Sequence, residues 1–374
     1  MIRALGMMSG TSLDGVDAAL IETDGIRIGG FGASAFRAFS DNESAVLHGG
    51  LGLWPDAPAV PDVARLVEAA HADLAASFPD AQLIGFHGQT LAHDPRGRGT
   101  HQAGDGATLA RATGCPVVWD FRSEDVRQGG EGAPLVPFFH WACAEWAVGQ
   151  GALPPAPVAF LNLGGVGNIS WVDPTAPSPE APGACLAFDT GPANAPLNDL
   201  MRARRRQSRD EGGALAAQGT PDAAIVAAFL QDPWFARPAP KSLDRDHFAD
   251  LSQAVARLGD ADAAATLVAA LAASVAAALD WLPSPPAQLL VCGGGRHNRA
   301  IMAALTRALP MPVTPVDSIG LDGDMLEAQA FGWLAVRVLR GLPISGPMTT
   351  GVPDPVCGGR ISHPRGSLTK LFGT

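Results

Sequence analysis

Extended apolar segments and turn residues alternate through the first 40 positions of the chain. The segments "IRALGMM", "VDAALIET" and "GIRIGGFGASAFRAF" follow one another, and the turn residues "SGTSLDG" stand between the first two. This pattern predicts a three-stranded meander. From Pro61 to Ser77 the apolar positions instead recur on one face at helical spacing, which predicts an amphipathic helix.

Two further apolar runs end in polar residues. "AQLIGFHGQT" reads as a buried strand with a polar, Gly-rich end, and "CPVVWDFRSEDV" repeats that design. Polar side chains at the ends of buried strands are candidates for chemistry, because the strands fix their positions.

The second half of the chain opens as the first half does. After the Pro-rich segment Gly151–Pro157, "VAFLNLGGVGNISWVDP" predicts two strands joined by a Gly/Asn turn, and "ACLAFDTGPANAPLNDLM" predicts a strand that leads into a helix. We interpret this as a weak structural repeat. Further helices are predicted at Asp222–Leu230, His247–Leu258, Ala263–Leu279, Asn298–Leu309 and Asp324–Arg340, with short buried strands in "AQLLVCGGG" and "MPVTPVD". The alternation favours an α/β protein.

The length of 374 residues predicts two domains, because single cores rarely grow past about 250–300 residues. We expect an N-terminal lobe at 1–150, a C-terminal lobe at 151–348 and an irregular extension at 349–374. The uncharged segment Ala263–Leu279 is short for a membrane span, and we expect it to be a core helix.

Charge and cysteine usage exclude several classes of partner. The net charge is −11 and the one basic run, Arg202–Arg209, is short, which argues against nucleic-acid binding. Five scattered cysteines without a C-x-x-C pair indicate reduced thiols, and no N-terminal signal pattern is found. We therefore expect a cytoplasmic protein that binds neither nucleic acid nor membrane.

Four turns at strand ends share one chemistry: "SGTSLDGVD", "NLGGVGN", "FDTGPAN" and "CGGGRHN". Glycines let backbone N–H groups approach an anion, and Ser, Thr and Asn add further donors. One such turn is weak evidence for a ligand. Four of them, each after a buried strand, favour a nucleotide held between two lobes.

Taken with "GFHGQT", "DFRSEDV", "GGEGAPLVP" and "GDMLEAQAFGWLA", these turns make the chain resemble the anhydro-N-acetylmuramic acid kinase family, from Met1 to about Gly346. The resemblance implies an α/β, two-lobed actin-like ATPase (ribonuclease H-like) fold with a central ATP and substrate cleft. It also implies ATP and Mg²⁺ as cofactors, a homodimer, and a sugar substrate whose 1,6-anhydro ring is opened by water while O6 is phosphorylated.

The resemblance assigns roles to the four turns. It implies that ATP is bound by a first loop, a second motif and an adenosine motif: Gly10, Thr11, Ser12, Leu13, Asp14, Gly15, Val16 and Asp17; Asn162, Gly164, Gly165 and Asn168; and Gly293, Gly294, Gly295 and Asn298. Asp14 and Asp17 would hold Mg²⁺ through water. Asp189 matches the catalytic aspartate, which takes a proton from the attacking water, and its alternative role is to cap the helix that follows.

Candidates for the sugar pocket lie at strand ends and on the last helix: His87, Gln89, Asp120, Arg122, Asp125, Asn194 and Glu327. Arg122 suits the lactyl carboxylate, because a guanidinium binds a carboxylate through two parallel hydrogen bonds, but it could equally pair with Asp120 or Asp125. His87 could instead be a neutral histidine at the end of a buried strand. Glu327 could be a first-turn acid of its helix.

Three departures from the family pattern affect these expectations. The family's "PKSTGRE" is "PKSLDRD" here, which leaves the shape of that segment open, its "DTGPGN" is "DTGPAN", and Glu131 replaces a common glutamine. We expect Ala193 to lie in an ordinary helical turn. The "KSLDRD" segment and Glu131 support one alternative, a kinase of this family for another sugar, and a second alternative is an ATP-switched binding protein.

Overall fold

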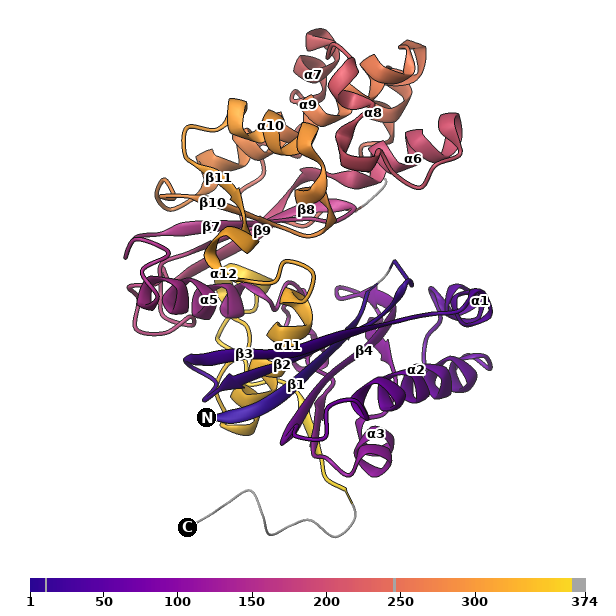
Figure 1. Ribbon diagram of the computed structural model, residues 1–374, viewed down its shortest axis with the longest axis vertical. Helices are drawn as coiled ribbons and strands as arrows, with labels where there is room; N and C mark the ends of the chain where they lie inside the picture. Colours follow the sequence, from indigo (N-terminus) through magenta and orange to yellow (C-terminus); the bar gives the residue numbers. More distant parts are fainter. Residues whose placement is uncertain (11, 245–246, 365–374) are drawn as a thin grey trace. The chain divides into compact units, whose positions relative to one another are not determined.

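The computed structural model describes residues 1–10, 12–244 and 247–364. The chain divides into two compact units. Unit 1 comprises Met1–Trp146 and Met325–Thr374, and unit 2 comprises Ala147–Asp324. The predicted α/β class is confirmed, since each unit contains a sheet with helices packed on it (Figure 1).

Unit 1 is built on a seven-stranded sheet in the order β12-β6-β4-β1-β2-β3, with β5 paired to β4. The strands are β1 (Ile2–Ser9), β2 (Gly15–Thr23), β3 (Ile28–Ala38), β4 (Leu83–Asp94), β5 (Gly99–Ala103), β6 (Val117–Trp119) and β12 (Arg360–Ser362). The predicted meander is present, because β1, β2 and β3 pair antiparallel. Strands β4 and β6 run parallel to β1.

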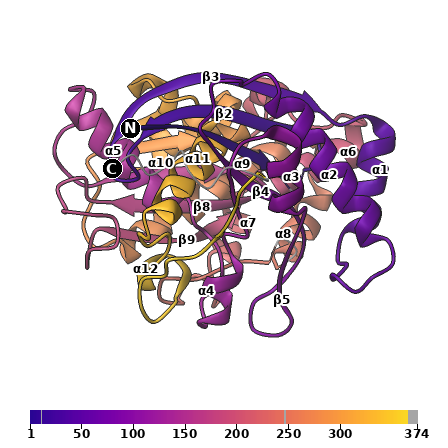
Figure 2. The ribbon, with the colours of Figure 1, turned by 90° about the horizontal axis from the view of Figure 1, so that it is seen from below.

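Helices cover both faces of this sheet. Successive side chains of β1 point to opposite faces, so the strand contacts a different helix on each face. Leu5 and Met7 join the apolar cluster that contains the buried face of α2 (Val60–Ala75), which lies beside α3 (Gly106–Thr113) in Figures 1 and 2. Gly6 points to the opposite face, against α11 (Leu326–Leu339). A Cβ atom on Gly6 would overlap the Ala328 carbonyl group, so α11 lies directly on the strands.

Unit 2 repeats the same strand order in a five-stranded sheet, β11-β10-β7-β8-β9. Its strands are β7 (Val158–Leu163), β8 (Val166–Val172), β9 (Cys185–Pro192), β10 (Leu289–Cys292) and β11 (Val313–Pro315). Strands β7, β8 and β9 pair antiparallel, and β10 and β11 are parallel to β7. The sheet matches β6-β4-β1-β2-β3 of unit 1 strand for strand. The weak structural repeat is therefore confirmed.

Helix α9 forms the core of unit 2. It runs over Asp260–Ala278, is long and apolar enough to cross a membrane by composition, and has most of its residues buried within the unit. The prediction of a core helix is confirmed. The remaining helices of this unit are α6 (Asn194–Arg205), α7 (Ala223–Phe229), α8 (Ala249–Ala254) and α10 (Arg299–Ala308), together with short 3₁₀ turns at Glu211–Gly213, Ala216–Gln218, Val255–Arg257, Leu279–Trp281, Gly294–His297 and Val316–Ile319.

The division of the chain differs from the expected boundaries at 150 and 348. Residues from Met325 onward belong to unit 1, because α11 packs on β1, β2 and β4. The segment 349–374 is likewise not an irregular extension over its described part. Helix α12 (Pro347–Thr350) extends into it, Val352 and Val356 are buried, and β12 pairs antiparallel with β6. A three-residue strand is too short to show a periodic pattern.

Several elements of unit 1 carry no clear sequence signal. Helices α1 (Asp41–Gly50), α4 (Ser123–Arg127) and α5 (Pro137–Gly149) and strand β5 are not predicted. In α5 the residues Phe138, Phe139 and Trp141 are all buried, so the helix is apolar on several sides and shows no single stripe. The predicted helix His247–Leu258 is shorter, since α8 gives way to a 3₁₀ turn.

Candidate functional site

The turn between β1 and β2 is tight and strained. The Leu13 N–H donates to the Gly10 carbonyl oxygen at 3.2 Å, and the Ser12 hydroxyl donates to the Asp14 carboxylate at 2.8 Å. Leu13 has a φ of +56°, in the left-handed region that disfavours its side chain, and that side chain is buried. Thr11 lies outside the described residues. The turn thus exposes Ser12 and Asp14 while Leu13 anchors it.

Gln89 supports this turn from the neighbouring strand. Its Oε1 accepts from the Ser9 hydroxyl at 2.8 Å, and its Nε2 donates to the Gly10 carbonyl oxygen at 3.2 Å. Gln89 is fully buried. Its position therefore favours a role in holding the turn over a direct contact with a sugar.

Strand β2 follows the turn and carries three of the predicted ATP-binding residues, Gly15, Val16 and Asp17. Gly15 and Val16 can contact a ligand through backbone atoms, and Asp17 through its carboxylate. Gly15 and Val16 are buried in β2, and a Cβ atom on Gly15 would overlap the Arg37 carbonyl group. Asp17 lies opposite Met8 in the β1–β2 register. No group of three or more His, Cys, Asp or Glu side chains suited to a metal ion is found among residues 1–10, 12–244 and 247–364.

His87, a buried residue within β4, and Arg122, a partly buried residue that follows β6, form a hydrogen-bonded pair. Arg122 Nε donates to His87 Nε2 at 3.0 Å, so Nδ1 carries the imidazole proton and donates to the Gly88 carbonyl oxygen at 2.8 Å. Burial, and then the charge of Arg122, hold the pKa of His87 well below its usual range. His87 is thus a neutral histidine whose two nitrogens both have protein partners.

The guanidinium of Arg122 is not paired with Asp120 or Asp125. Its Nη1 donates to the Gly132 carbonyl oxygen at 3.1 Å, and no acceptor for Nη2 is found in the part of the chain that the structure describes. Burial lowers the pKa of this guanidinium, and the charges of Glu327 and Asp125 oppose that effect. The structure therefore leaves one edge of Arg122 available to an anion.

The two aspartates beside Arg122 have structural partners. Asp120, with a φ of +56°, accepts from the Ser123 hydroxyl and forms an ion pair with Arg360 at 3.0 Å. The fully buried Asp125 accepts from the Gly132 N–H at 2.7 Å, and also from the hydroxyls of Ser345 and Thr350. Asp125 therefore joins the C-terminal segment to the loop at Gly132.

Two further acidic side chains, Glu131 and Glu327, lie close to the pair formed by His87 and Arg122. Glu131 forms an ion pair with Arg96 at 2.7 Å, which compensates the charge that the glutamine of the family would not carry. Glu327 stands in the first turn of α11, as its structural alternative requires, and its charge also acts on Arg122. It therefore lies near the same group of residues.

In unit 2, three polar residues lie in one row across the sheet. Asn162 of β7 is in register with Asn168 of β8, which is in register with Asp189 of β9. Asn168 Nδ2 donates to Asp189 Oδ1 at 2.9 Å. Paired residues on adjacent strands point to the same face, so these side chains share one surface.

The carboxylate of Asp189 is held in place and remains partly exposed. Its second oxygen accepts from the Leu243 N–H at 2.7 Å, and the Asp189 N–H donates to the Lys241 carbonyl oxygen at 2.9 Å. Burial raises the pKa of this carboxyl group, and the hydrogen bonds from Asn168 and Leu243 oppose the rise. Asp189 does not cap α6, because Ala193 occupies the N-cap position.

These contacts explain two departures from the family pattern. Leu243 binds Asp189 through its backbone N–H, which any residue other than proline supplies, and its side chain packs on the core of unit 2. Ala193 has a φ of −118°, so no left-handed backbone is required there. It stands at the N-cap and not within a helical turn as expected.

Asn194 shapes the Gly-rich turn between β7 and β8. Its N–H donates to the Gly164 carbonyl oxygen at 2.9 Å, and its Nδ2 donates to the Leu163 carbonyl oxygen at 2.7 Å. The Gly165 carbonyl oxygen accepts from the Ala193 N–H at 3.0 Å. This role of Asn194 is structural, because the start of α6 binds the carbonyl oxygens of Leu163, Gly164 and Gly165 and so holds the turn.

The turn after β10 lies directly beside the β7–β8 turn. Gly293 has a φ of +71°, and a Cβ atom there would overlap the Asn162 side chain, while one on Gly295 would lie 2.5 Å from the Leu163 Cβ atom. Gly294 faces open space. Asn298 caps α10, since its Oδ1 accepts from the Ile301 N–H at 3.1 Å.

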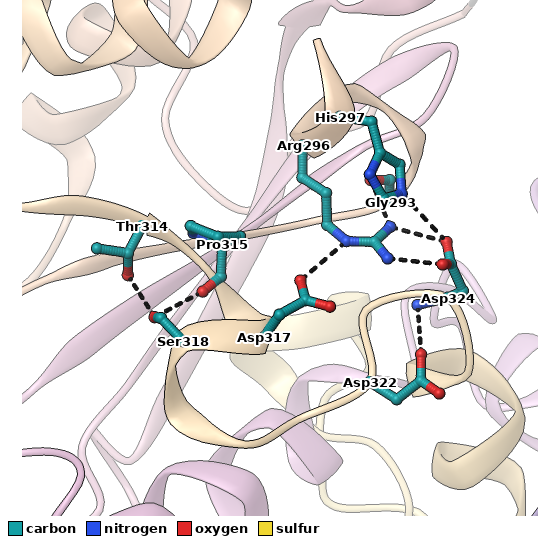
Figure 3. A network of polar contacts seen from close by, with 9 residues as sticks. All are labelled: Gly293, Arg296, His297, Thr314, Pro315, Asp317, Ser318, Asp322 and Asp324. Carbon is teal, nitrogen blue, oxygen red and sulfur yellow. Dashed lines mark hydrogen bonds and ion pairs between the residues drawn. The ribbon is translucent and has the colours of Figure 1, made fainter. Parts of the chain in front are cut away.

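A buried arginine fixes this turn (Figure 3). Arg296 Nε donates to Asp317 at 3.0 Å, and its two terminal nitrogens donate to the two oxygens of Asp324 at 2.8 and 2.7 Å. Nη1 also donates to the Gly293 carbonyl oxygen at 3.2 Å. The bidentate pair holds the Gly-rich turn against the segment where the chain leaves unit 2.

The structure thus forms one group of candidate residues in each unit. In unit 1 these are the β1–β2 turn, His87 and Gln89 within β4 and the segment after β6, and in unit 2 they are the β7–β8 turn, Asp189 and the β10 turn. Sequence reasoning missed the roles of Arg296 and of the backbone of Lys241 and Leu243. A charged residue within a Gly-rich turn is a signal for Arg296, but contacts through backbone atoms leave no residue signature.

Comparisons with known proteins identify the family of the chain. The family model described as "Anhydro-N-acetylmuramic acid kinase" matches residues 60–364. A protein of Cereibacter sphaeroides with that name is 64% identical over 97% of this chain and 96% of its own, and one of Jannaschia sp. is 57% identical over the same shares. A ROK family glucokinase structure from Streptomyces griseus is 13% identical, covers 89% of this chain and 99% of its own, and has a TM-score of 0.43. By the match of the family model and of these relatives over nearly its full length, the chain belongs to the anhydro-N-acetylmuramic acid kinase family.

Proposed function

We propose that the protein uses ATP and water to convert 1,6-anhydro-N-acetylmuramic acid into N-acetylmuramic acid 6-phosphate in the cytoplasm, as a step of cell-wall recycling. Family membership supports the substrate, and Asp189 carries the proposal for the chemistry. Its carboxylate is anchored by Asn168 and Leu243, yet each oxygen keeps a lone pair for a water molecule.

The reaction assigns a proton acceptor to Asp189. Water attacks the anomeric carbon, its proton passes to the carboxylate, and the bond from that carbon to O6 breaks as O6 takes the γ-phosphoryl group. General-base catalysis of this kind contributes about 10²- to 10⁴-fold. Burial raises the pKa of Asp189, which makes it a stronger base than an exposed aspartate.

In this proposal the Gly-rich turns bind the phosphate groups of ATP. Ser12 and the backbone of the β1–β2 turn would contact phosphate oxygens, and the turns at Gly164 and Gly293 would serve the rest of ATP. The carboxylates of Asp14 and Asp17 suit Mg²⁺ held through water, because that ion prefers oxygen ligands, and it would neutralise phosphate charge. An Asp14→Asn variant should need a higher Mg²⁺ concentration for half-maximal rate.

Arg122 is the proposed ligand of the lactyl carboxylate. The edge that carries Nη2 has no acceptor among the described residues, and His87 fixes the plane of the guanidinium. An Arg122→Ala change should raise the apparent KM for the muramic sugar far more than that for ATP. Equal effects on both would count against this contact.

One assay separates this function from its two alternatives. ADP release is measured with ATP and Mg²⁺, with and without 1,6-anhydro-N-acetylmuramic acid, and the 6-phosphate is identified by mass spectrometry. Stimulation by another sugar alone would favour a different kinase specificity. Hydrolysis insensitive to every sugar would favour an ATP-switched binding protein. We also propose a homodimer, which sedimentation of the purified protein tests.

A further inference from the structure

Lys241 occupies an aromatic enclosure in unit 2. Its Nζ lies 4.4 Å from the ring centroid of Trp234, 5.3 Å from that of Trp281 and 5.9 Å from that of Phe188. It also donates to the carbonyl oxygens of Phe235 at 3.0 Å and of Trp234 at 3.4 Å. Aromatic faces and carbonyl oxygens both attract a cation, so the enclosure suits an ammonium group.

The segment that carries this lysine holds Asp189 at two points. The Lys241 carbonyl oxygen accepts from the Asp189 N–H, and the Leu243 N–H donates to the Asp189 carboxylate. Between them, the Ser242 carbonyl oxygen accepts from Trp234 Nε1 at 3.2 Å. The buried Trp234 therefore anchors both the lysine side chain and the middle of the segment.

We propose that Lys241 is a positioning residue for the reaction: its ammonium group fixes the segment Lys241–Leu243 against the aromatic enclosure and thereby fixes the carboxylate of Asp189. The inference rests on the proposed function, in which Asp189 is the base. The Lys241 side chain itself contacts neither the Asp189 carboxylate nor the reacting atoms.

The ammonium charge of Lys241, and not only its aliphatic chain, binds to this enclosure. Burial lowers the pKa of Lys241 to about 8, with a smaller contribution from the charge of Arg237. An ammonium that is half buried costs free energy unless carbonyl oxygens and ring faces compensate it. If this side chain only filled space, a methionine of similar volume would do so without the free-energy cost of burying a charge.

The test is a double-mutant cycle with Asp189→Asn and Lys241→Met, measured as kcat and as KM for ATP and for the sugar. We expect Lys241→Met to lower kcat about 10- to 100-fold with both KM values within about twofold, since misplacement of a catalytic group affects the transition state. In the Asp189→Asn background the same change should cost nothing further, because the carboxylate that it positions is gone.

The pH profile supplies a second readout. Among the described residues, the groups that face the Asp189 carboxylate are the Asn168 amide and the Leu243 N–H. Because a hydrogen bond to a carboxylate lowers its pKa, a loosened Leu243 contact should move the acidic limb of the kcat profile to higher pH in Lys241→Met. Lys241→Arg, which keeps the charge, should recover part of kcat and shift the limb less.

Arg237→Met is the matched control, because it removes an exposed positive charge from the same loop without a contact to Asp189. It should leave kcat and the acidic limb unchanged. Equal losses from Lys241→Met in both backgrounds, or a wild-type kcat in that variant, would overturn the inference. Full activity of Asp189→Asn would instead refute the proposed base, and so the two failures are distinct.

Discussion

At the scale of single residues, the site depends on how carboxylates are paired. Asp120 and Asp125 bind hydroxyls, a guanidinium and a backbone N–H within unit 1, whereas Asp189 accepts from the Asn168 amide and the Leu243 N–H and in the proposed function also binds the attacking water. Identical side chains therefore have different roles, which their partners decide. The loss of Asp189 as Asn should lower kcat about 10²- to 10⁴-fold while ATP still binds, as measured by steady-state rates and calorimetry.

The acidic side of the rate profile follows from the raised pKa of Asp189. The base works only when ionised, so kcat should fall as the pH drops through a pKa above the usual aspartate value of about 3.9. An Asn168→Ala change removes a hydrogen bond that favours the ionised form, and should move this limb to higher pH. A limb that stays in place would mean that Asn168 does not bind the carboxylate during turnover.

Sequence reasoning at this scale identified the strand-end residues but not their partners. The polar residues within "GFHGQT" and "FDTGPAN" could be predicted as candidates because each motif follows a buried apolar run, although β4 continues past the predicted end to Asp94. The ion pair of Arg96 with Glu131, and the contact of Leu243 with Asp189, join positions far apart in the chain. Neither periodicity nor spacing records such contacts.

At the scale of elements, close packing of α11 on the first sheet makes two glycines obligatory. A side chain on Gly6 or Gly85 would overlap carbonyl groups of α11. The hairpins and the amphipathic α2 were predictable from their patterns, whereas α5 was not, because it is apolar on several sides. The tight approach of α11 to the sheet is equally invisible in the sequence pattern.

A Gly6→Ala change should destabilise unit 1 by at least about 1–3 kcal/mol, the usual cost of overpacking, because backbone carbonyls cannot move aside as a side chain could. Gly30→Ala is the matched control in the same sheet, since no atom lies within 4 Å of the added Cβ position. Denaturant unfolding of both variants measures the difference. Equal stability of the two would show that α11 can shift away from β1.

At the scale of the whole molecule, unit 2 is one uninterrupted stretch of sequence, which divides the sequence of unit 1 into two stretches. Ala147–Asp324 contains its complete sheet and core, whereas unit 1 needs both ends of the chain. The sequence predicted two domains and their internal repeat, but it placed the second boundary too late. The pattern of α11 shows an apolar helix and does not show which sheet it covers.

Expressed alone, residues 147–324 should fold and unfold cooperatively, because every strand neighbour and the buried α9 are retained. Residues 1–146 alone should be soluble only poorly, since the face of β1 and β4 that α11 covers would be exposed. Far-ultraviolet circular dichroism and thermal unfolding of the two fragments test this. A cooperative transition in residues 1–146 would contradict it.

The late position of α11 also has a consequence for protein synthesis. All strands of the first sheet except β12 leave the ribosome early, but the helix that covers one of their faces is made only at residues 326–339. Domains fold as units while the chain grows. One apolar face of the first sheet is therefore uncovered during the synthesis of the whole of unit 2. We expect this face to be the longest-exposed binding site for a chaperone that binds nascent chains.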